Sequence, residues 1–156
     1  LGNRSILAKP YPASNKDYIN NKIKFREEFR PFAPVVLEEE AHKYFYLSQT
    51  SPNMLFAVQA TALGRKKCPA TVHIDNSARV QTVNHKQNLR LYNLLGSFFA
   101  LTEVPILLNT SFNIKGQPIV ETPKEAIDTF ISTALDVLVI EDYLLVKEKN
   151  DIKLIR

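Results

Sequence analysis

The fold is decided by one stretch, Pro105-Ile106-Leu107-Leu108-Asn109-Thr110-Ser111-Phe112-Asn113. Its first four residues form an apolar run, and together with Asn109 they are predicted to form a buried strand. Polar side chains follow at once, and the carboxyl end of a buried strand is where α/β sheets usually bind ligands. Ser111 and Asn113 offer a hydroxyl and an amide that suit a phosphate, a ribose or a base edge, and Gly116 lets the backbone approach a ligand. The alternative is a loop rich in turn formers.

A helix is expected on each side of this strand. Residues 88–102 carry apolar side chains at the i, i+3, i+4, i+7 and i+8 spacing of a helix with one buried face: Leu91, Leu94, Leu95, Phe98 and Phe99. A second helix begins at Thr122, because Thr122 and Glu125 can form a capping box and Pro123 suits the first helical position. Its apolar face consists of Ala126, Ile127, Phe130, Ile131 and Ala134.

The remaining elements are short. Strands are expected at 22–29, 35–37, 54–60, 70–74, 78–83, 136–140 and 144–147, and short helices at 14–21, capped by Ser14 or Asn15, and at 38–45. The total is a twisted mixed β-sheet with flanking helices, an α/β or α+β fold. The tail, residues 148–156, is mostly charged and is expected to fray.

Composition describes an ordinary globular chain. Its 156 residues suit one domain, with 45% hydrophobic and 23% charged residues. No apolar run approaches the length of a membrane span, and no secretory signal is visible. Cys68 has no partner for an internal disulfide, which fits a reducing compartment and predicts a cytoplasmic location. The chain starts at Leu1 rather than Met, so we expect a piece of a longer polypeptide.

The net charge of +4 is compatible with surface lysines or with a site for phosphate or nucleic acid. Nucleic acid is not the expected partner, since 65–67 is only a short basic loop. Lys24 and Arg26 are more specific. On a strand they project from the same face, about 7 Å apart, and an anion between them would relieve their repulsion. The simpler interpretation is a solvated face on an edge strand.

A third polar stretch spans residues 73–81. His73 and Asp75 share a face if the strand continues, residues 75–77 resemble a turn, and Arg79 and Gln81 could face one cleft. Each has a structural alternative: a hydrogen-bonded histidine, an Asx-turn and a surface arginine. The sequence contains no nucleophile elbow, no Walker A motif and no Gly-x-Gly-x-x-Gly fingerprint. Histidine spacing and the single cysteine give no metal site.

Four motifs together resemble the carbamoyltransferase family, the group that contains nodulation and antibiotic-tailoring O-carbamoyltransferases. They are LGNRSILA at 1–8, KIKFRE followed by FRPFAP within 22–34, HIDxSARVQTV at 73–83 and LLNTSFNxxGxPIV at 107–120. The resemblance runs from residue 1 to about residue 147. Four motifs in the same order are far more specific than any one of them.

The resemblance implies a C-terminal domain with a fold like that of YrdC/Sua5 proteins. Residues 1–8 would be the remnant of a junction with an absent N-terminal transferase domain, residues 9–147 the domain itself and 148–156 a charged tail. This domain would form carbamoyladenylate from carbamoyl phosphate and ATP. A kinase-like N-terminal domain of the same polypeptide would then transfer the carbamoyl group to a hydroxyl acceptor.

The resemblance also assigns residues. The Lys-x-Arg and Ser-x-Asn pairs of YrdC-like proteins correspond to Lys24, Arg26, Ser111 and Asn113. As hypotheses, Lys24 and Arg26 bind the phosphates and stabilise the departing pyrophosphate, with Arg79 as a further catalytic candidate. The nucleotide-binding candidates beside Lys24 and Arg26 are Ser111, Asn113, His73 and Asn109. Mg²⁺ is expected to arrive with ATP, without a dedicated protein site.

One residue departs from the family pattern, and two alternatives remain. Asn76 stands where relatives commonly carry glycine, and asparagine tolerates a left-handed turn. The first alternative is a threonylcarbamoyl-adenylate synthase using bicarbonate and threonine, which the motif at 1–5 argues against. The second is a non-catalytic nucleotide- or RNA-binding module, whose RNA binding would weaken steeply with salt.

Overall fold

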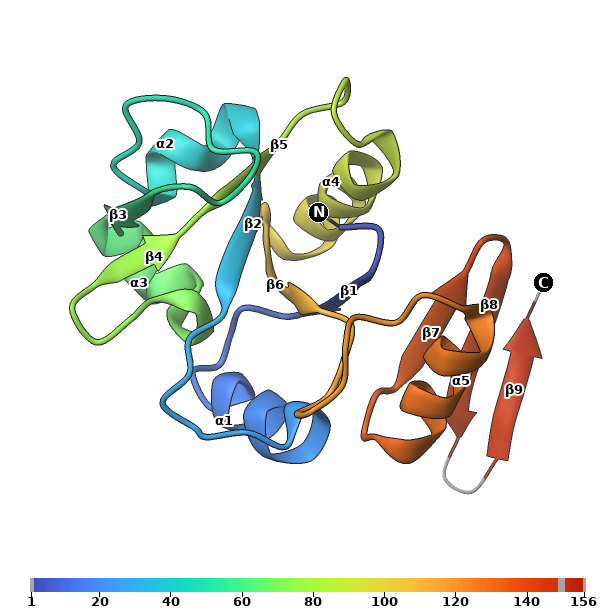
Figure 1. The fold of residues 1–156 in the computed structure, drawn as a ribbon. Coiled ribbons are helices and arrows are strands. Elements are labelled where there is room, and N and C mark those ends of the chain that lie inside the picture. The colour runs from blue at the N-terminus through green and yellow to red at the C-terminus, as the bar shows by residue number, and fades with distance from the viewer. Residues whose placement is uncertain (1, 149–150, 156) are drawn as a thin grey trace.

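The computed structural model describes residues 2–148 and 151–155. At its centre is a four-stranded sheet with the order β1-β6-β2-β5 (Figure 1). These strands are β1 (Ser5–Ala8), β6 (Ile106–Ser111), β2 (Ala33–Leu37) and β5 (Gln81–Val83). β6 pairs antiparallel with both β1 and β2, whereas β2 and β5 are parallel. The predicted α/β class with a mixed sheet is therefore confirmed, and β6 extends two residues beyond the predicted 105–109.

Helix α4 (Leu89–Thr102) covers one face of this sheet, as Figure 1 shows beside β6 and β2. Leu91 and Leu95 are buried in a cluster with strand residues of that face: Val35, Leu37, Val83 and Leu107. The Asn88 side chain caps the helix by accepting from the backbone N–H of Leu91. The predicted helix is confirmed, although Leu94 is exposed to solvent rather than buried.

The opposite face is covered by two groups of short elements. One group comprises η2 (Glu38–Glu40), α2 (Ala41–Tyr44), α3 (Ala62–Lys67), η3 (Pro69–Thr71) and the two-stranded sheet of β3 (Ala57–Gln59) and β4 (Ser77–Arg79). Its core contains the fully buried Phe45, Val36 and Ile106. The helix predicted at 38–45 is confirmed as a 3₁₀ turn followed by an α-turn.

Three strand predictions in this region need correction. The strand expected at 54–60 covers only 57–59. The strand expected at 70–74 is absent, because Pro69 starts a 3₁₀ turn in which the Thr71 hydroxyl donates to the Cys68 carbonyl. The strand expected at 78–83 divides at the buried Val80. β4 pairs with β3, and β5 pairs with β2 in the other sheet.

The second group begins with α1 (Asn15–Ile19), which continues into a π-helical turn, η1 (Asn20–Lys24). The short helix expected at 14–21 is confirmed, although Ser14 makes no side-chain capping bond. The strand expected at 22–29 is wrong. Ile23 and Phe25 do not share a buried face: Ile23 is buried with Ile19, four residues away as in a helix, whereas Phe25 is exposed.

The C-terminal part contains α5 (Pro123–Ser132) and a three-stranded sheet of β7 (Val137–Ile140), β8 (Tyr143–Glu148) and β9 (Asp151–Ile155). The capping box of Thr122 and Glu125 is confirmed, as are the two predicted strands. Ala126 and Phe130 face the core, but Ile131 is exposed. Instead of fraying, residues 151–155 pair with β8; residues 149, 150 and 156 of the expected tail lie outside the described residues. No helix in the described ranges is long and apolar enough to cross a membrane.

Candidate functional site

The Lys24 side chain is turned into the protein at the end of η1, where it is 3% exposed. Its ammonium donates to the backbone carbonyls of Ser111, at 2.9 Å, and Asn113, at 2.7 Å. It also donates to Asn113 Oδ1 at 2.8 Å and lies 3.4 Å from Ser111 Oγ. An ammonium has three protons, so the four neutral acceptors at the end of β6 engage all of them, and a phosphate oxygen would bind Lys24 by displacing one of these acceptors.

Ser111 and Asn113 are fixed to one another as well as to the lysine. Ser111 Oγ donates to Asn113 Oδ1 at 2.6 Å, and Asn113 Nδ2 donates to the Gln117 carbonyl at 2.7 Å. A backbone bond from Lys115 N to the Lys24 carbonyl ties the same loop to η1. The structure therefore brings Lys24 together with two residues that lie 87 and 89 positions later in the sequence. We call Lys24, Ser111 and Asn113 the lysine cluster.

The lysine cluster contains no negative charge. Burial, and secondarily the charge of Arg26, lower the pKa of Lys24 to about 8. In the part of the chain that the structure describes, neither Lys24 nor Arg26 forms an ion pair with a carboxylate. A buried ammonium surrounded by neutral acceptors and a second cation is an environment that an anionic ligand would stabilise.

Arg26 is oriented by a residue that the sequence did not single out, Asn20. Arg26 Nε donates to Asn20 Oδ1 at 2.7 Å, and its guanidinium lies 4.7 Å from the centre of the Phe32 ring. Asn20 is fully buried, and its Nδ2 donates to the carbonyls of Glu28, at 3.2 Å, and Arg30, at 3.0 Å. No sequence pattern marks Asn20, since its role depends on a turn that was predicted as a strand.

The backbone between the two cations is strained. Phe25 has φ 50°, in the left-handed region that bulky side chains rarely adopt. This residue ends η1 and separates Lys24 from Arg26, so the two side chains do not project from one face of a strand as predicted. Short π-helical turns and left-handed non-glycine residues occur often at functional sites. The observed outlier therefore supports a functional role for this turn.

Asn109 forms a second polar contact on the same face of the sheet. Residues 109 and 111 alternate along β6, so their side chains lie on one face. Asn109 Nδ2 donates to Gln81 Oε1 at 2.7 Å, and both side chains are only 3% exposed. This bond crosses β2, the strand between β6 and β5, in which Ala33 pairs with Asn109 and Val35 pairs with Gln81.

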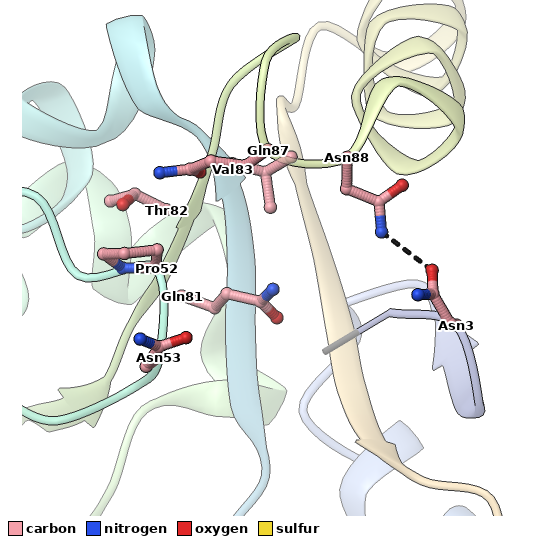
Figure 2. A pocket seen from close by; sticks show the side chains of 8 residues that line it. All are labelled: Asn3, Pro52, Asn53, Gln81, Thr82, Val83, Gln87 and Asn88. Carbon is pink, nitrogen blue, oxygen red and sulfur yellow. Dashed lines mark hydrogen bonds between the residues drawn. The ribbon is translucent and has the colours of Figure 1, made fainter.

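Gln81 also lines a cavity of about 350 Å³ beside the first turn of α4 (Figure 2). The lining residues are Asn3, Pro52, Asn53, Gln81, Thr82, Val83, Gln87 and Asn88. Asn88 Nδ2 donates to Asn3 Oδ1 at 3.0 Å, which joins the start of α4 to the N-terminal segment. From its position in the sequence Gln81 was expected only to face a cleft with Arg79, and its contact with Asn109 was not predicted.

The remaining predicted site residues lie in the β3–β4 region. His73 Nδ1 lies 3.2 Å from Ser77 Oγ, which donates to Asp75 Oδ1. Burial lowers the pKa of His73 despite the nearby Asp75 carboxylate. Arg79 is exposed and donates to the Met54 carbonyl at 3.3 Å. Within the described residues, no hydrogen bond joins His73 or Arg79 to the lysine cluster.

Two expectations about this stretch have opposite outcomes. Asn76 adopts φ 64°, so asparagine does accommodate the left-handed turn expected there. Arg79 and Gln81 do not face one cleft through a common strand. Arg79 is exposed on β4, whereas Gln81 is buried on β5 of the other sheet.

The chain matches known proteins over most of its length. The family Carbamoyltransferase C-terminus matches residues 1–147. The nodulation protein NolNO of Sinorhizobium fredii is 48% identical over 150 residues, covering 94% of this chain and 22% of that protein. The nodulation protein NolO of Bradyrhizobium diazoefficiens is 46% identical and has 27% of its length covered. Nodulation protein U of B. diazoefficiens is 44% identical over 117 residues, which cover 75% of this chain and 20% of that protein.

The chain thus spans about a quarter or less of these relatives. The match ends where the resemblance was expected to end, at residue 147, and includes every residue of the lysine cluster. It also includes residues 5–8, expected as a junction, which form β1 at the edge of the central sheet. A match over nearly the whole chain, at 44–48% identity to these nodulation proteins, shows that the chain belongs to the Carbamoyltransferase C-terminus family.

Proposed function

We propose that this chain is the ATP-using half of an O-carbamoyltransferase and forms carbamoyladenylate from carbamoyl phosphate and ATP. The lysine cluster with Arg26 carries this proposal, because it offers a polyphosphate two cations that form no ion pair with a carboxylate among the described residues. A planar, delocalised guanidinium beside a compact ammonium suits a row of phosphate oxygens. The family's name supports the carbamoyl substrate.

The proposed chemistry needs positioning and positive charge rather than a protein nucleophile. Carbamoyl phosphate first loses its phosphate to water, which gives carbamate and inorganic phosphate. A carbamate oxygen then bonds to the α-phosphorus of ATP, and the bond to pyrophosphate breaks. Lys24 and Arg26 would stabilise the charge that develops on the leaving pyrophosphate. Ser111 and Asn113 would hold the nucleotide near them, with Asn109 on the same face of the sheet.

Mg²⁺ is expected with ATP, but the described residues do not supply its ligands. No group of three or more His, Cys, Asp or Glu side chains gathers in the ranges described. Glu27, close to Arg26 in sequence, already accepts from Lys115 and Arg30. Phosphate oxygens and water would therefore have to hold the Mg²⁺ ion.

The acceptor half of the reaction would belong to another part of the polypeptide. The relatives are four to five times longer than the matched region, which leaves room for the proposed kinase-like N-terminal domain. That domain would take the carbamoyl group from the adenylate and transfer it to a hydroxyl. We propose a YrdC/Sua5-like origin for the activating fold on the strength of the Lys-x-Arg and Ser-x-Asn pairs.

Carbamoyl-phosphate-dependent release of pyrophosphate from ATP tests the proposal. Lys24→Ala and Arg26→Ala should each weaken ATP binding about tenfold or more, since a hydrogen bond to a charged group contributes roughly 1.5–3 kcal/mol. Lys66→Ala, at an exposed lysine, is the matched control. Unchanged ATP binding in both site variants contradicts the proposal. Activity with bicarbonate and threonine instead of carbamoyl phosphate would identify a threonylcarbamoyl-adenylate synthase.

A further inference from the structure

The cavity beside α4 differs in chemistry from the lysine cluster. Five of its eight lining residues are Asn or Gln, and none is charged. In Figure 2 the Gln81 side chain extends from β5 toward the side on which Asn3 and Asn88 lie, while Asn53 lies on the other side. Pro52 and Val83 contribute apolar surface to the wall of the cavity. Such a lining suits an uncharged ligand with several hydrogen-bonding atoms.

Gln81 holds an unused donor in this cavity. It is 3% exposed, and its Oε1 accepts from Asn109 Nδ2. Its Nε2 donates to no residue that the structure describes. Asn53 likewise makes no side-chain hydrogen bond within those residues and lines the cavity from the loop before β3. Both amides can therefore bind a ligand without breaking a bond of the protein.

The cavity and the lysine cluster are connected along β6, although Lys24 itself comes from η1 on the other face of the central sheet. Asn109 contacts Gln81 at the cavity, and Ser111 follows two residues later on the same face of β6, about 7 Å further along. Ser111 contacts Lys24. A ligand that lies along this face would meet neutral amides at one end and cations at the other. Nucleotides have this division, with an uncharged planar base and anionic phosphates.

We propose that the amide-lined cavity binds the nucleobase of the nucleotide whose phosphates bind Lys24 and Arg26. This inference rests on the proposed function. The free amide NH₂ groups donate to ring nitrogens or carbonyl oxygens of the base, and the amide oxygens accept from its exocyclic amino group. Pro52 and Val83 contact the apolar faces of the ring. Gln81 is thereby a binding residue, and Asn109 a positioning residue that acts through it.

Calorimetric titration of the chain with ATP and with inorganic tripolyphosphate tests this division. Asn53→Ala and Gln81→Ala should each weaken ATP binding roughly 2- to 13-fold, the equivalent of one hydrogen bond of about 0.5–1.5 kcal/mol. Their affinity for tripolyphosphate, which has no base, should stay within about twofold of the unmutated chain. Gln49→Ala, at an exposed glutamine outside the cavity, should change neither.

The outcomes separate the two proposals. Loss of ATP affinity with unchanged tripolyphosphate affinity supports the base site. Equal losses for both ligands, or no loss for either, overturn the base site and leave the phosphate site standing. Failure of the unmutated chain to bind either ligand overturns the proposed function and the base site with it. Gln81→Ala leaves Asn109 without its acceptor and could unfold the chain, in which case the exposed Asn53 variant decides.

Discussion

Binding of tripolyphosphate should weaken as the pH rises through about 8, because Lys24 loses its proton there. Burial lowers the pKa of Lys24 from 10.5 to about 8. Only the ammonium form attracts an anion strongly, so the fraction of binding-competent protein is nearly constant below pH 7. Above pH 8 that fraction falls about tenfold with each pH unit. The expected loss between pH 7 and pH 9 is therefore roughly tenfold.

The same pKa shift gives a matching prediction for the stability of the ligand-free chain. The lysine keeps its proton up to about pH 10.5 when unfolded but loses it near pH 8 when folded. Between these values the unfolded state binds more protons, so the free energy of unfolding rises with pH. One pKa unit corresponds to 1.36 kcal/mol, which sets a ceiling of about 3 kcal/mol. The hydrogen bonds that Lys24 donates to Ser111 and Asn113 favour its charged form and reduce the expected gain to on the order of 1–2 kcal/mol.

Lys24→Met is the matched variant for both measurements, since its unbranched side chain is only one atom shorter and has no titrating group. Calorimetric affinities would be recorded for both proteins at half-unit steps from pH 6.5 to pH 9.5. The ratio of the two affinities cancels the titration of the ligand itself. Urea unfolding from pH 7 to pH 10.5 gives the stability difference, which cancels tyrosine titration in the same way.

A constant affinity ratio across this pH range would refute the reasoning, because it would mean that the Lys24 charge does not contribute to binding. A ratio that falls only above pH 10 would show a lysine with an ordinary pKa, and hence a solvated side chain. Either result would remove the uncompensated buried ammonium on which the proposed phosphate site depends.

Two further predictions concern the scaffold. Asn20→Ala should lower the free energy of unfolding by about 2 kcal/mol, because it removes three hydrogen bonds of a buried amide. It should also weaken tripolyphosphate binding, because Arg26 is no longer held in place. Asn20→Asp keeps the acceptor for Arg26 Nε and should bind tripolyphosphate more tightly than Asn20→Ala; equal affinities of the two variants would argue against a positioning role of Asn20. Gly64→Ala should lower the free energy of unfolding, measured in urea, by more than about 3 kcal/mol, because the added Cβ would lie 2.2 Å from the Tyr44 carbonyl oxygen. Gly96→Ala, where no atom lies within 4 Å of the added Cβ, should raise the free energy of unfolding by up to about 1 kcal/mol. Similar effects at both positions would contradict the close packing of Gly64.

The elements that sequence analysis predicted well are those with strong local signals. The helix at 88–102 has a capping asparagine and a periodic apolar face, and both features act within one element. The same holds for the capping box of α5 and for the apolar run of β6. These signals do not depend on contacts with distant residues, so they can be recognised before the fold is known.

The errors fall where tertiary contacts override the local pattern. Alternation at 22–29 predicted a strand, but Lys24 folds inward to meet carbonyl groups 87 and 89 positions away. The family resemblance grouped Lys24 with Ser111 and Asn113, and the structure brings these three residues together, but the alternation predicted the wrong backbone geometry for Lys24. The contacts of Asn20 and Gln81 were not predicted, because each side-chain amide accepts a hydrogen bond from a partner that no sequence-spacing rule connects to it.

The lysine cluster is easier to explain by ligand binding than by stability. A buried methionine at position 24 would avoid desolvating a charge, and an ion pair with a carboxylate would compensate the charge of a lysine. Position 24 is nevertheless a buried lysine, and it forms no ion pair with any residue that the structure describes. The adjoining turn adds a left-handed Phe25, which costs on the order of 1–2 kcal/mol. Both costs fall within three consecutive residues and lie beside a fully buried amide that orients Arg26. An anion bound between the two cations would offset the electrostatic part of this cost, so ligand binding and local stability must be coupled at this turn.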